Sequence, residues 1–329
     1  MIKGGRPFAG RSFFVQKTTH VCKKCRFDIE KCEKVCYNSG EDEVRKMKRL
    51  LSLLLIGCIL LATGLLAACD DAPNGEIARI TFLDVGQGDC VLIRTTWGNI
   101  LIDAGTEDAE EMLVRRLEDL GVETLELAVF THPDEDHVGG ADGVLKRIPT
   151  KRIWLPQTAK TVENESYAQL LSVANSRGIA VEYVQAGELL RLGEVRLFTL
   201  APLRESTTDS NEGSIVLKLI CGRATALFTG DVGEKTEKEL VACYGASQLS
   251  CSLYKVGHHG SSTSTSDALL EAMRPTWAVV CCGLDNPYGH PHGEVLERLA
   301  EKGITVYRTD LSGEISFSCD GERFALMED

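Results

Sequence analysis

Basic residues are scarce over most of this 329-residue sequence. The chain has 36 Lys and Arg against 48 Asp and Glu, yet residues 1–69 hold 13 of the basic residues and only 6 of the acidic ones. The remainder therefore carries a formal charge near −19. Such an acidic surface repels polyanions and argues against tight, nonspecific nucleic-acid binding, although bound divalent cations would reverse that field locally.

The sequence also lacks internal repeats of solenoid length and low-complexity linkers. Its composition, 43% hydrophobic and 26% charged, is that of a globular protein with one large core or two modest ones. Beyond Cys69 an odd number of cysteines remains, mostly within or beside apolar runs, which favours small buried core residues over a disulfide framework. None lies with the histidines described below, so we expect mostly free thiols and no thiolate ligand. These cysteines are Cys90, Cys221, Cys243, Cys251, Cys281, Cys282 and Cys319.

A nearly unbroken apolar stretch runs from Leu50 to Ala68, with basic residues before it and Asp70 and Asp71 after it. This pattern is typical of a membrane-targeting segment. If translation starts at Met47, residues 47–69 form a lipoprotein signal peptide. If translation starts at Met1, the stretch is an internal membrane anchor whose N-terminal side lies inside the cell.

The lipoprotein interpretation depends on the segment Leu66-Ala67-Ala68-Cys69, which resembles a bacterial lipobox. Cys69 would then carry the lipid. In either interpretation residues 70–329 face outward, so we expect an extracytoplasmic domain attached to the outer face of the cell membrane.

Residues 1–46 contain Cys22, Cys25, Cys32 and Cys36, a spacing that allows a short Cys-rich zinc site. The second pair is irregularly spaced and no apolar core surrounds it. The alternative is an upstream extension produced by a start codon assigned too early.

Strand-like and helical patterns alternate through residues 70–329. Amphipathic spacing predicts helices at Glu107–Leu120, Glu163–Ser176, Glu234–Tyr244 and Glu294–Glu301. Apolar runs predict strands at Ile77–Leu83, Cys90–Arg94, Ile100–Ile102, Leu125–Phe130, Val195–Leu200, Ser214–Ile220, Ala224–Phe228, Leu253–Val256 and Trp277–Cys281, and near Val181 and Leu189. Hairpins together with crossovers indicate mixed sheets covered by helices.

Histidine is rare, with seven in the chain, but six of the seven fall into three tight clusters. The first cluster combines two imidazoles with two usable carboxylates directly after an apolar run. Because each cluster follows the end of a predicted strand, the sequence predicts a metal-binding edge. The three clusters are His132/His137, His258/His259 and His290/His292.

Six segments occur in an order that resembles the metallo-β-lactamase superfamily and, within it, the hydrolase domain of the competence protein ComEC and its stand-alone relatives. The resemblance spans Ile77 to about Phe324. The segments are Phe82-Leu83-Asp84-Val85-Gly86-Gln87-Gly88-Asp89, Leu101-Ile102-Asp103-Ala104-Gly105, Thr131-His132-Pro133-Asp134-Glu135-Asp136-His137, Thr229-Gly230-Asp231, Lys255-Val256-Gly257-His258-His259-Gly260-Ser261 and Asn286-Pro287-Tyr288-Gly289-His290-Pro291.

The resemblance implies an α/β fold, the αββα sandwich of two mixed sheets flanked by helices, with two divalent metal ions at one rim. It also implies the metal ligands: His132 and Asp134 for the first ion, Asp136, His137 and His258 for the second, and Asp231 as the bridge. Most of the superfamily has a histidine at the position of Asp134. A harder oxygen ligand shifts the preference from strict zinc toward manganese.

The chain also lacks a histidine between His137 and His258, where many members of the superfamily use one. Asp209, Asn211 or Ser214 would stand in there, or the first metal would stay open.

Two cations about 3.5–4 Å apart lower the pKa of a bridging water, supply a metal-bound hydroxide and clamp the oxygens of a displacement at phosphorus. Asp136 belongs to this catalytic group. We expect His290, or else His259, to protonate the leaving oxygen or to hold a substrate phosphate.

Further residues are expected around this centre rather than in it. Asp84 and Asp103 would orient histidines or loop backbone, and the loop around Gln87 would approach the cleft. Asp84 and Asp89 are either such groups or plain turn carboxylates. Substrate contacts are expected from Ser261, Ser262 and His292.

The leading hypothesis is a metal-dependent phosphodiesterase or nuclease whose substrate is a phosphodiester such as DNA. An alternative is hydrolysis of a carboxylic ester, lactone or β-lactam, because one fold hosts many chemistries. A third is a non-catalytic, DNA-handling surface lipoprotein. The sequence indicates no protein partner.

Overall fold

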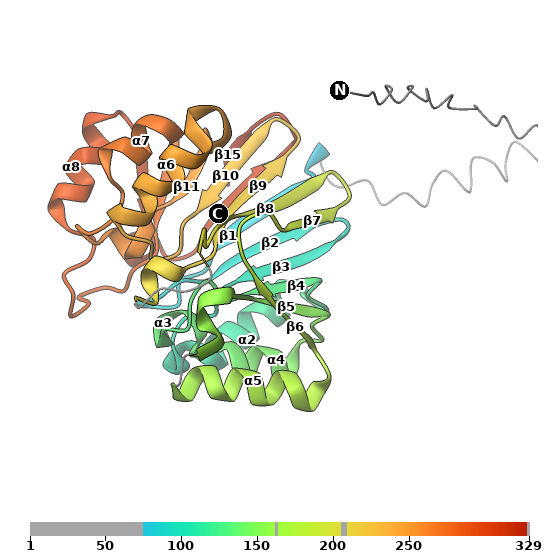
Figure 1. The fold of residues 1–329 in the computed structure, drawn as a ribbon. Helices are drawn as coiled ribbons and strands as arrows, with labels where there is room; N and C mark the ends of the chain where they lie inside the picture. The colour runs from blue at the N-terminus through green and yellow to red at the C-terminus, as the bar shows by residue number, and fades with distance from the viewer. Residues whose placement is uncertain (1–74, 162–163, 205–208, 328–329) are drawn as a thin grey trace, which may run out of the picture. The chain divides into compact units, whose positions relative to one another are not determined.

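Two mixed β-sheets pack face to face with helices outside in the computed structural model (Figure 1). The structure describes residues 75–161, 164–204 and 209–327. These belong to one compact unit, Asp71–Asp329. The predicted Cys-rich segment 1–46, the signal or anchor segment 47–69 and the lipidation site Cys69 lie outside the described residues.

The first sheet has eight strands and combines antiparallel pairs with a parallel run from β3 to β6. In spatial order the strands are β15 (Phe324–Leu326), β14 (Ile315–Cys319), β1 (Ala78–Phe82), β2 (Val91–Thr95), β3 (Gly98–Ile102), β4 (Leu127–Val129), β5 (Arg152–Pro156) and β6 (Ala180–Val184).

The second sheet has seven strands, with a parallel run from β10 to β13. In spatial order they are β13 (Thr305–Arg308), β12 (Trp277–Val280), β11 (Leu253–Lys255), β10 (Ala224–Phe228), β9 (Val216–Cys221), β8 (Val195–Ala201) and β7 (Leu189–Leu192).

Each sheet carries its own layer of helices. The first sheet packs against α2 (Glu110–Asp119), α4 (Ala141–Arg147) and α5 (Glu165–Arg177). The second sheet packs against α6 (Glu234–Leu249), α7 (Asp267–Met273) and α8 (Gly293–Glu301). Two single-turn helices, α3 (Glu135–Val138) and α9 (Thr309–Ser312), lie in loops. The predicted αββα sandwich is therefore confirmed.

Successive side chains of a strand point to opposite faces of the sheet, so each strand contributes both to the core between the sheets and to the layer under the helices. In β2, Val91 and Ile93 enter the core between the sheets, whereas Leu92 faces the helices. In β10, Phe228 enters the same central core and Leu227 faces the other helical layer. Both faces of the central strands are apolar, which explains their nearly continuous hydrophobic sequence.

The predicted elements are found with shifts of a few residues at their ends. The helix predicted at Glu107–Leu120 begins with a 3₁₀ turn at Glu107–Ala109 and continues as α2. The sequence prediction omitted several short elements, such as β5 and α7, whose patterns are only five and seven residues long.

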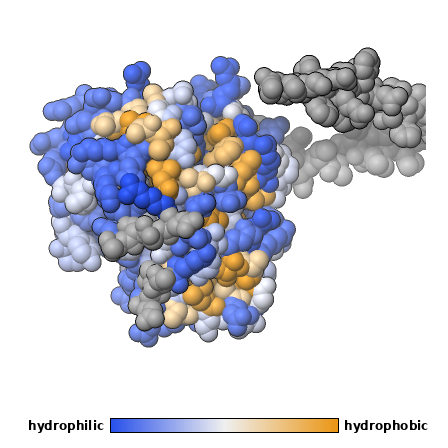
Figure 2. Space-filling model, in the orientation of Figure 1, coloured by the Kyte–Doolittle hydropathy of each residue, from blue (hydrophilic) through white to orange (hydrophobic). Residues whose placement is uncertain are grey.

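Figure 2 shows hydrophilic residues over most of the visible face, with apolar residues in smaller patches. Within the described ranges, no helix has both the length and the apolar character needed to cross a membrane.

Truncating the central aromatic contact should weaken the sandwich. Phe82 is fully buried, and its ring centroid lies 6.3 Å from that of Phe228 and 6.4 Å from that of Phe317. Phe82→Ala should lower the free energy of unfolding by about 3–5 kcal/mol, measured by urea denaturation. Leu311→Ala, at a side chain that is 68% exposed, should change it by no more than about 0.5 kcal/mol. Equal losses in the two variants would contradict this assignment of the core.

Candidate metal centre

Loops from both sheets meet at one edge of the sandwich. The loop after β4 carries His132 and His137, the turn after β10 carries Asp231, and the 3₁₀ turn after β11 carries His259. Because β10 and β11 are parallel, their carboxyl ends open at the same edge, which brings Asp231 and His259 together.

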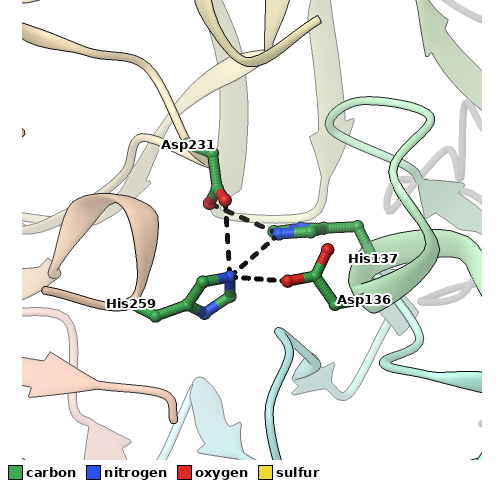
Figure 3. A group of neighbouring side chains, drawn as sticks. All are labelled: Asp136, His137, Asp231 and His259. Carbon is green, nitrogen blue, oxygen red and sulfur yellow. Dashed lines mark hydrogen bonds and ion pairs between the residues drawn. The ribbon is translucent and has the colours of Figure 1, made fainter. Parts of the chain in front are cut away.

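Four side chains form the tightest group, which we call the central cluster: Asp136, His137, Asp231 and His259 (Figure 3). The Nε2 atom of His259 lies 3.1 Å from Asp136 Oδ2 and 3.3 Å from Asp231 Oδ2. The Nε2 atom of His137 lies 3.3 Å from Asp231 Oδ1 and 3.3 Å from His259 Nε2. One ligand atom from each of the four residues lies within 4.8 Å of all the others.

A buried carboxylate fixes the ring of His137. Its Nδ1 donates a hydrogen bond of 2.8 Å to Asp103 Oδ2, which leaves Nε2 facing the cluster. Asp103 in turn accepts bonds of 2.7 Å from both the backbone N and the Oγ1 of Thr131. Asp103 thus fixes the orientation of a histidine of the central cluster.

His259 is held by a second buried network. Its Nδ1 donates a hydrogen bond of 2.9 Å to the carbonyl oxygen of Cys281 and lies 3.2 Å from Asp89 Oδ1. The carboxylate of Asp89 also forms an ion pair with Lys255. Asp89 is only 3% exposed and Lys255 only 2%. Asp89 is therefore more than a turn carboxylate.

Of the two neighbouring histidines, His259 and not His258 lies in the central cluster. Both residues adopt left-handed backbone conformations, with φ of 48° and 52°, so these neighbours project differently. The side chain of His258 is 26% exposed, its Nε2 lies 3.7 Å from Asp231 Oδ2, and its Nδ1 lies 3.2 Å from the Oγ1 of Thr263. His258, the predicted ligand, thus lies beside the central cluster, and His259, the alternative acid, lies within it.

His132 and Asp134 lie beside the central cluster on the side of Asp231. The Nε2 atom of His132 is 3.7 Å from Asp134 Oδ2 and 3.9 Å from Asp231 Oδ2. Asn211 was one of three residues considered for this side, with Asp209 and Ser214, and it forms local hydrogen bonds. Its backbone N donates to Asp209, and its side-chain oxygen accepts from Ser210.

Close contact between loops explains one glycine of the Gly86-Gln87-Gly88 segment. A Cβ atom on Gly88 would lie 2.4 Å from the carbonyl oxygen of Asp136, so any other residue would push this loop away. The backbone N of Asp89 donates to the same carbonyl at 3.1 Å. Gln87 accepts a hydrogen bond from the backbone N of Gly283, and Asp84 accepts one within its own turn, from Gly86.

The imidazoles and carboxylates of the site shift one another's pKa values. Burial alone would lower the pKa of His137 and His259, but Asp231 and the other nearby carboxylates outweigh it and raise the pKa of both imidazoles well above the usual range. Burial alone would raise the pKa of Asp231, but His137 and His259 hold it well below its ordinary value. Burial, followed by the charge of His137, lowers the pKa of His132 to about 3.

These donors fit a divalent metal ion. The Nε2 atom of His132 is buried and has no hydrogen-bond partner within the described part of the chain, and Asp231 Oδ1, also buried, has only its ion pair with His137. Buried polar atoms without hydrogen bonds are costly, and a divalent cation bound among these converging carboxylates and imidazoles would satisfy both atoms. Imidazole with carboxylate is a donor set used by zinc and manganese.

The third histidine cluster lies next to the second. The ring centroid of His290 is 5.7 Å from that of His258 and 6.2 Å from that of His259, and Tyr288 stacks on His290 at 5.5 Å. Burial, followed by the charges of His259 and His258, lowers the pKa of His290 to about 4. His290 is therefore neutral at pH 7, and its buried Nδ1 has no partner among the described residues.

Ser261, Ser262 and His292, the other residues expected to contact substrate, form hydrogen bonds within the protein. The backbone N of Ser262 donates to His292 Nδ1 at 2.9 Å, and the hydroxyl groups of Ser261 and Thr263 lie 3.0 Å apart.

A surface pocket of about 510 Å³ adjoins the centre. Its lining contains three carboxylates and no Lys or Arg of the described residues. The lining residues are Gln87, Thr106, Asp134, Glu135, Asp136, Asn164, Pro287 and Tyr288.

Sequence reasoning missed Lys255 and Thr131 as parts of the site. Lys255 had a visible signal, because it is a charged residue in the otherwise apolar run Leu253–Val256. Thr131 had none beyond its place next to His132.

The chain is similar in sequence to known proteins. The chain is 29% identical over 293 residues to ComE operon protein 3 of Bacillus subtilis, covering 84% of this chain and 37% of that protein. It is 35% identical over 264 residues to competence protein ComA of Neisseria gonorrhoeae, covering 79% and 35%. The chain thus spans little more than a third of these relatives.

A solved structure with a metallo-β-lactamase fold, YhfI from Bacillus subtilis, is 10% identical with a TM-score of 0.48, covering 74% of this chain and 100% of that chain. The family model described as the metallo-beta-lactamase superfamily matches residues 83–283, which is more than half of the chain and includes all the residues of the central cluster. The protein therefore belongs to the metallo-β-lactamase superfamily, and its relatives include competence proteins.

Proposed function

We propose that this protein is a metal-dependent hydrolase of phosphodiester bonds, with a nucleic acid as its substrate and a dinuclear centre of zinc or manganese. The central cluster carries this proposal. Asp136, His137, Asp231 and His259 would hold one ion, and His132 and Asp134 would complete a second position that shares Asp231. Bound divalent ions activate water and stabilise the negative charge that develops at phosphorus.

Two observations support a phosphodiester over a carboxylic ester or β-lactam. Asp134 makes the donor set rich in oxygen, which suits ions that bind phosphate oxygens. The relatives are named competence proteins, and another, recombination protein 2 of Haemophilus influenzae, is 30% identical over 255 residues. These names point to DNA handling in the relatives and support a nucleic-acid substrate here.

The residues around the centre have separate roles in this proposal. Asp103 and Thr131 keep Nε2 of His137 facing the ions. The acidic pocket excludes free anions until the ions reverse its field, so substrate binding depends on metal.

His290 best fits the second of its two predicted roles. A neutral imidazole is a weak proton donor, but its N–H can hydrogen-bond a phosphate oxygen. We therefore assign His290 to holding the substrate phosphate rather than to protonating the leaving oxygen.

The location of the domain remains a proposal from sequence. The apolar stretch Leu50–Ala68 would attach it to the outer face of the membrane, through lipidated Cys69 or as a span.

Replacing the shared carboxylate should remove metal and activity together. Asp231→Asn should lower bound metal, measured by inductively coupled plasma mass spectrometry, and reduce phosphodiester hydrolysis more than the about 10–100-fold typical of outer-shell changes. Asp320→Asn is a matched control, because Asp320 lies in a turn where it accepts backbone hydrogen bonds from Glu322 and Arg323 and pairs with the side chain of Arg323 at 4.0 Å. Full metal content and turnover in Asp231→Asn would refute the assignment.

The role of His290 can be tested by comparing two substrates that differ in their leaving group. His290→Ala should slow cleavage of a dinucleotide and of bis-(p-nitrophenyl) phosphate by similar factors of about 10–100, the loss of one hydrogen bond to a charged group. A general acid would matter only for the dinucleotide, because p-nitrophenolate leaves without a proton. A defect confined to the dinucleotide would instead indicate that His290 is the general acid. The metal content of His290→Ala should equal that of the wild type.

A substrate panel separates the reaction classes. With manganese or zinc, the protein should cleave bis-(p-nitrophenyl) phosphate and plasmid or single-stranded DNA, because the site favours phosphoryl oxygens. Chelation by EDTA should abolish the activity. Cleavage of nitrocefin alone would favour the β-lactam alternative, and no cleavage by metal-loaded protein would favour a binding function.

A further inference from the structure

The ion pair between Asp89 and Lys255 lies inside the protein next to the central cluster. Asp89 comes from the loop before β2 in the first sheet, and Lys255 is the last residue of β11 in the second. Both are at least 97% buried, and burying a charged pair is costly in itself. Apolar residues of similar volume would fill the same space without this cost, so packing alone does not explain the pair.

Asp89 connects Lys255 to the ligands. Its Oδ1 lies 3.2 Å from Nδ1 of His259, and its Oδ2 lies 3.9 Å from Nδ1 of His137. Its backbone N donates to the carbonyl oxygen of Asp136, another residue of the central cluster. Any movement of Asp89 would therefore be transmitted to three of the four cluster residues.

The two buried carboxylates behind the imidazoles are held in different ways. Asp103, behind His137, is fixed by two uncharged donors of Thr131. Asp89, behind His259, is fixed by the ammonium group of Lys255. Lys255 thus supplies a permanent positive charge among carboxylates that would otherwise repel one another.

We propose that Lys255 is a positioning residue of the metal centre: it neutralises and anchors Asp89, so that Asp89, together with the carbonyl oxygen of Cys281, holds His259 with Nε2 turned toward Asp136 and Asp231. This inference rests on the metal centre of the proposed function. Partners that orient a ligating imidazole and raise its basicity affect metal affinity even though they never touch the ion.

The experiment measures metal binding by the full chain without any assay of activity. Metal-free protein is titrated with Mn²⁺ and, separately, with Zn²⁺ in a calorimeter, and its thermal melting temperature is recorded. The variants are Lys255→Met, Asp89→Asn and the double variant that carries both changes. Lys255→Met leaves a buried charge without a partner, whereas the double variant removes both charges at similar volume.

Lys218→Met is the matched control. Lys218 is also a buried lysine, only 8% exposed, but its ammonium group donates to the backbone carbonyl oxygens of Gln248 and Ser250 rather than to a carboxylate. Its loss should lower the melting temperature and leave metal affinity unchanged.

We expect Lys255→Met and the double variant to bind metal about 10–100-fold more weakly than the wild type. The double variant should regain melting temperature relative to Lys255→Met but not regain affinity, which a purely structural ion pair would not produce. A folded double variant that binds metal as tightly as the wild type would overturn this inference alone. A wild-type chain that takes up neither ion would overturn the proposed metal centre as well.

Discussion

Repulsion among buried carboxylates is the constraint on which this structure depends. Asp89, Asp103 and Asp231 are each at most 3% exposed, and Asp136 approaches the same imidazole as Asp231. Two like charges 4 Å apart repel by about 4 kcal/mol at an effective dielectric constant of 20. The site therefore needs positive charge, and the nearby carboxylates accordingly raise the pKa of His137 and His259 well above the usual range, which favours protons on these imidazoles. Metal ions would displace these protons, because ligating imidazoles must be neutral.

The sandwich supplies the rigidity that such a site requires. Ligands come from loops of both sheets, and backbone hydrogen bonds tie these loops together near the centre. Ala104 donates to the carbonyl oxygen of His137 at 2.8 Å, and Ile215 donates to that of Thr131 at 2.8 Å. The second of these bonds joins the two sheets, since Thr131 follows β4 and Ile215 precedes β9. The ligand geometry and the packing of the central core are therefore coupled.

In the proposed function, substrate binding in the pocket beside the metal centre also depends on cations. The pocket beside the centre is lined by Asp134, Glu135 and Asp136, and the chain as a whole is acidic. A phosphodiester would be repelled from this surface in the absence of metal. Binding and chemistry are thus expected to share one requirement, and the exposed ring of Tyr288 adds an apolar face at the rim.

Local patterns in the sequence determined most strands of the two sheets, the longer helices and the residue types of the site, because alternation and ligand-rich turns are visible within a few residues. They also placed Asp103 and Asp231 at strand ends. Only the tertiary structure decided that His259 rather than His258 enters the central cluster, since adjacent residues in one tight turn point in different directions. Only packing between the sheets paired Asp89 with Lys255, because 166 positions of sequence separate two charges that meet in space.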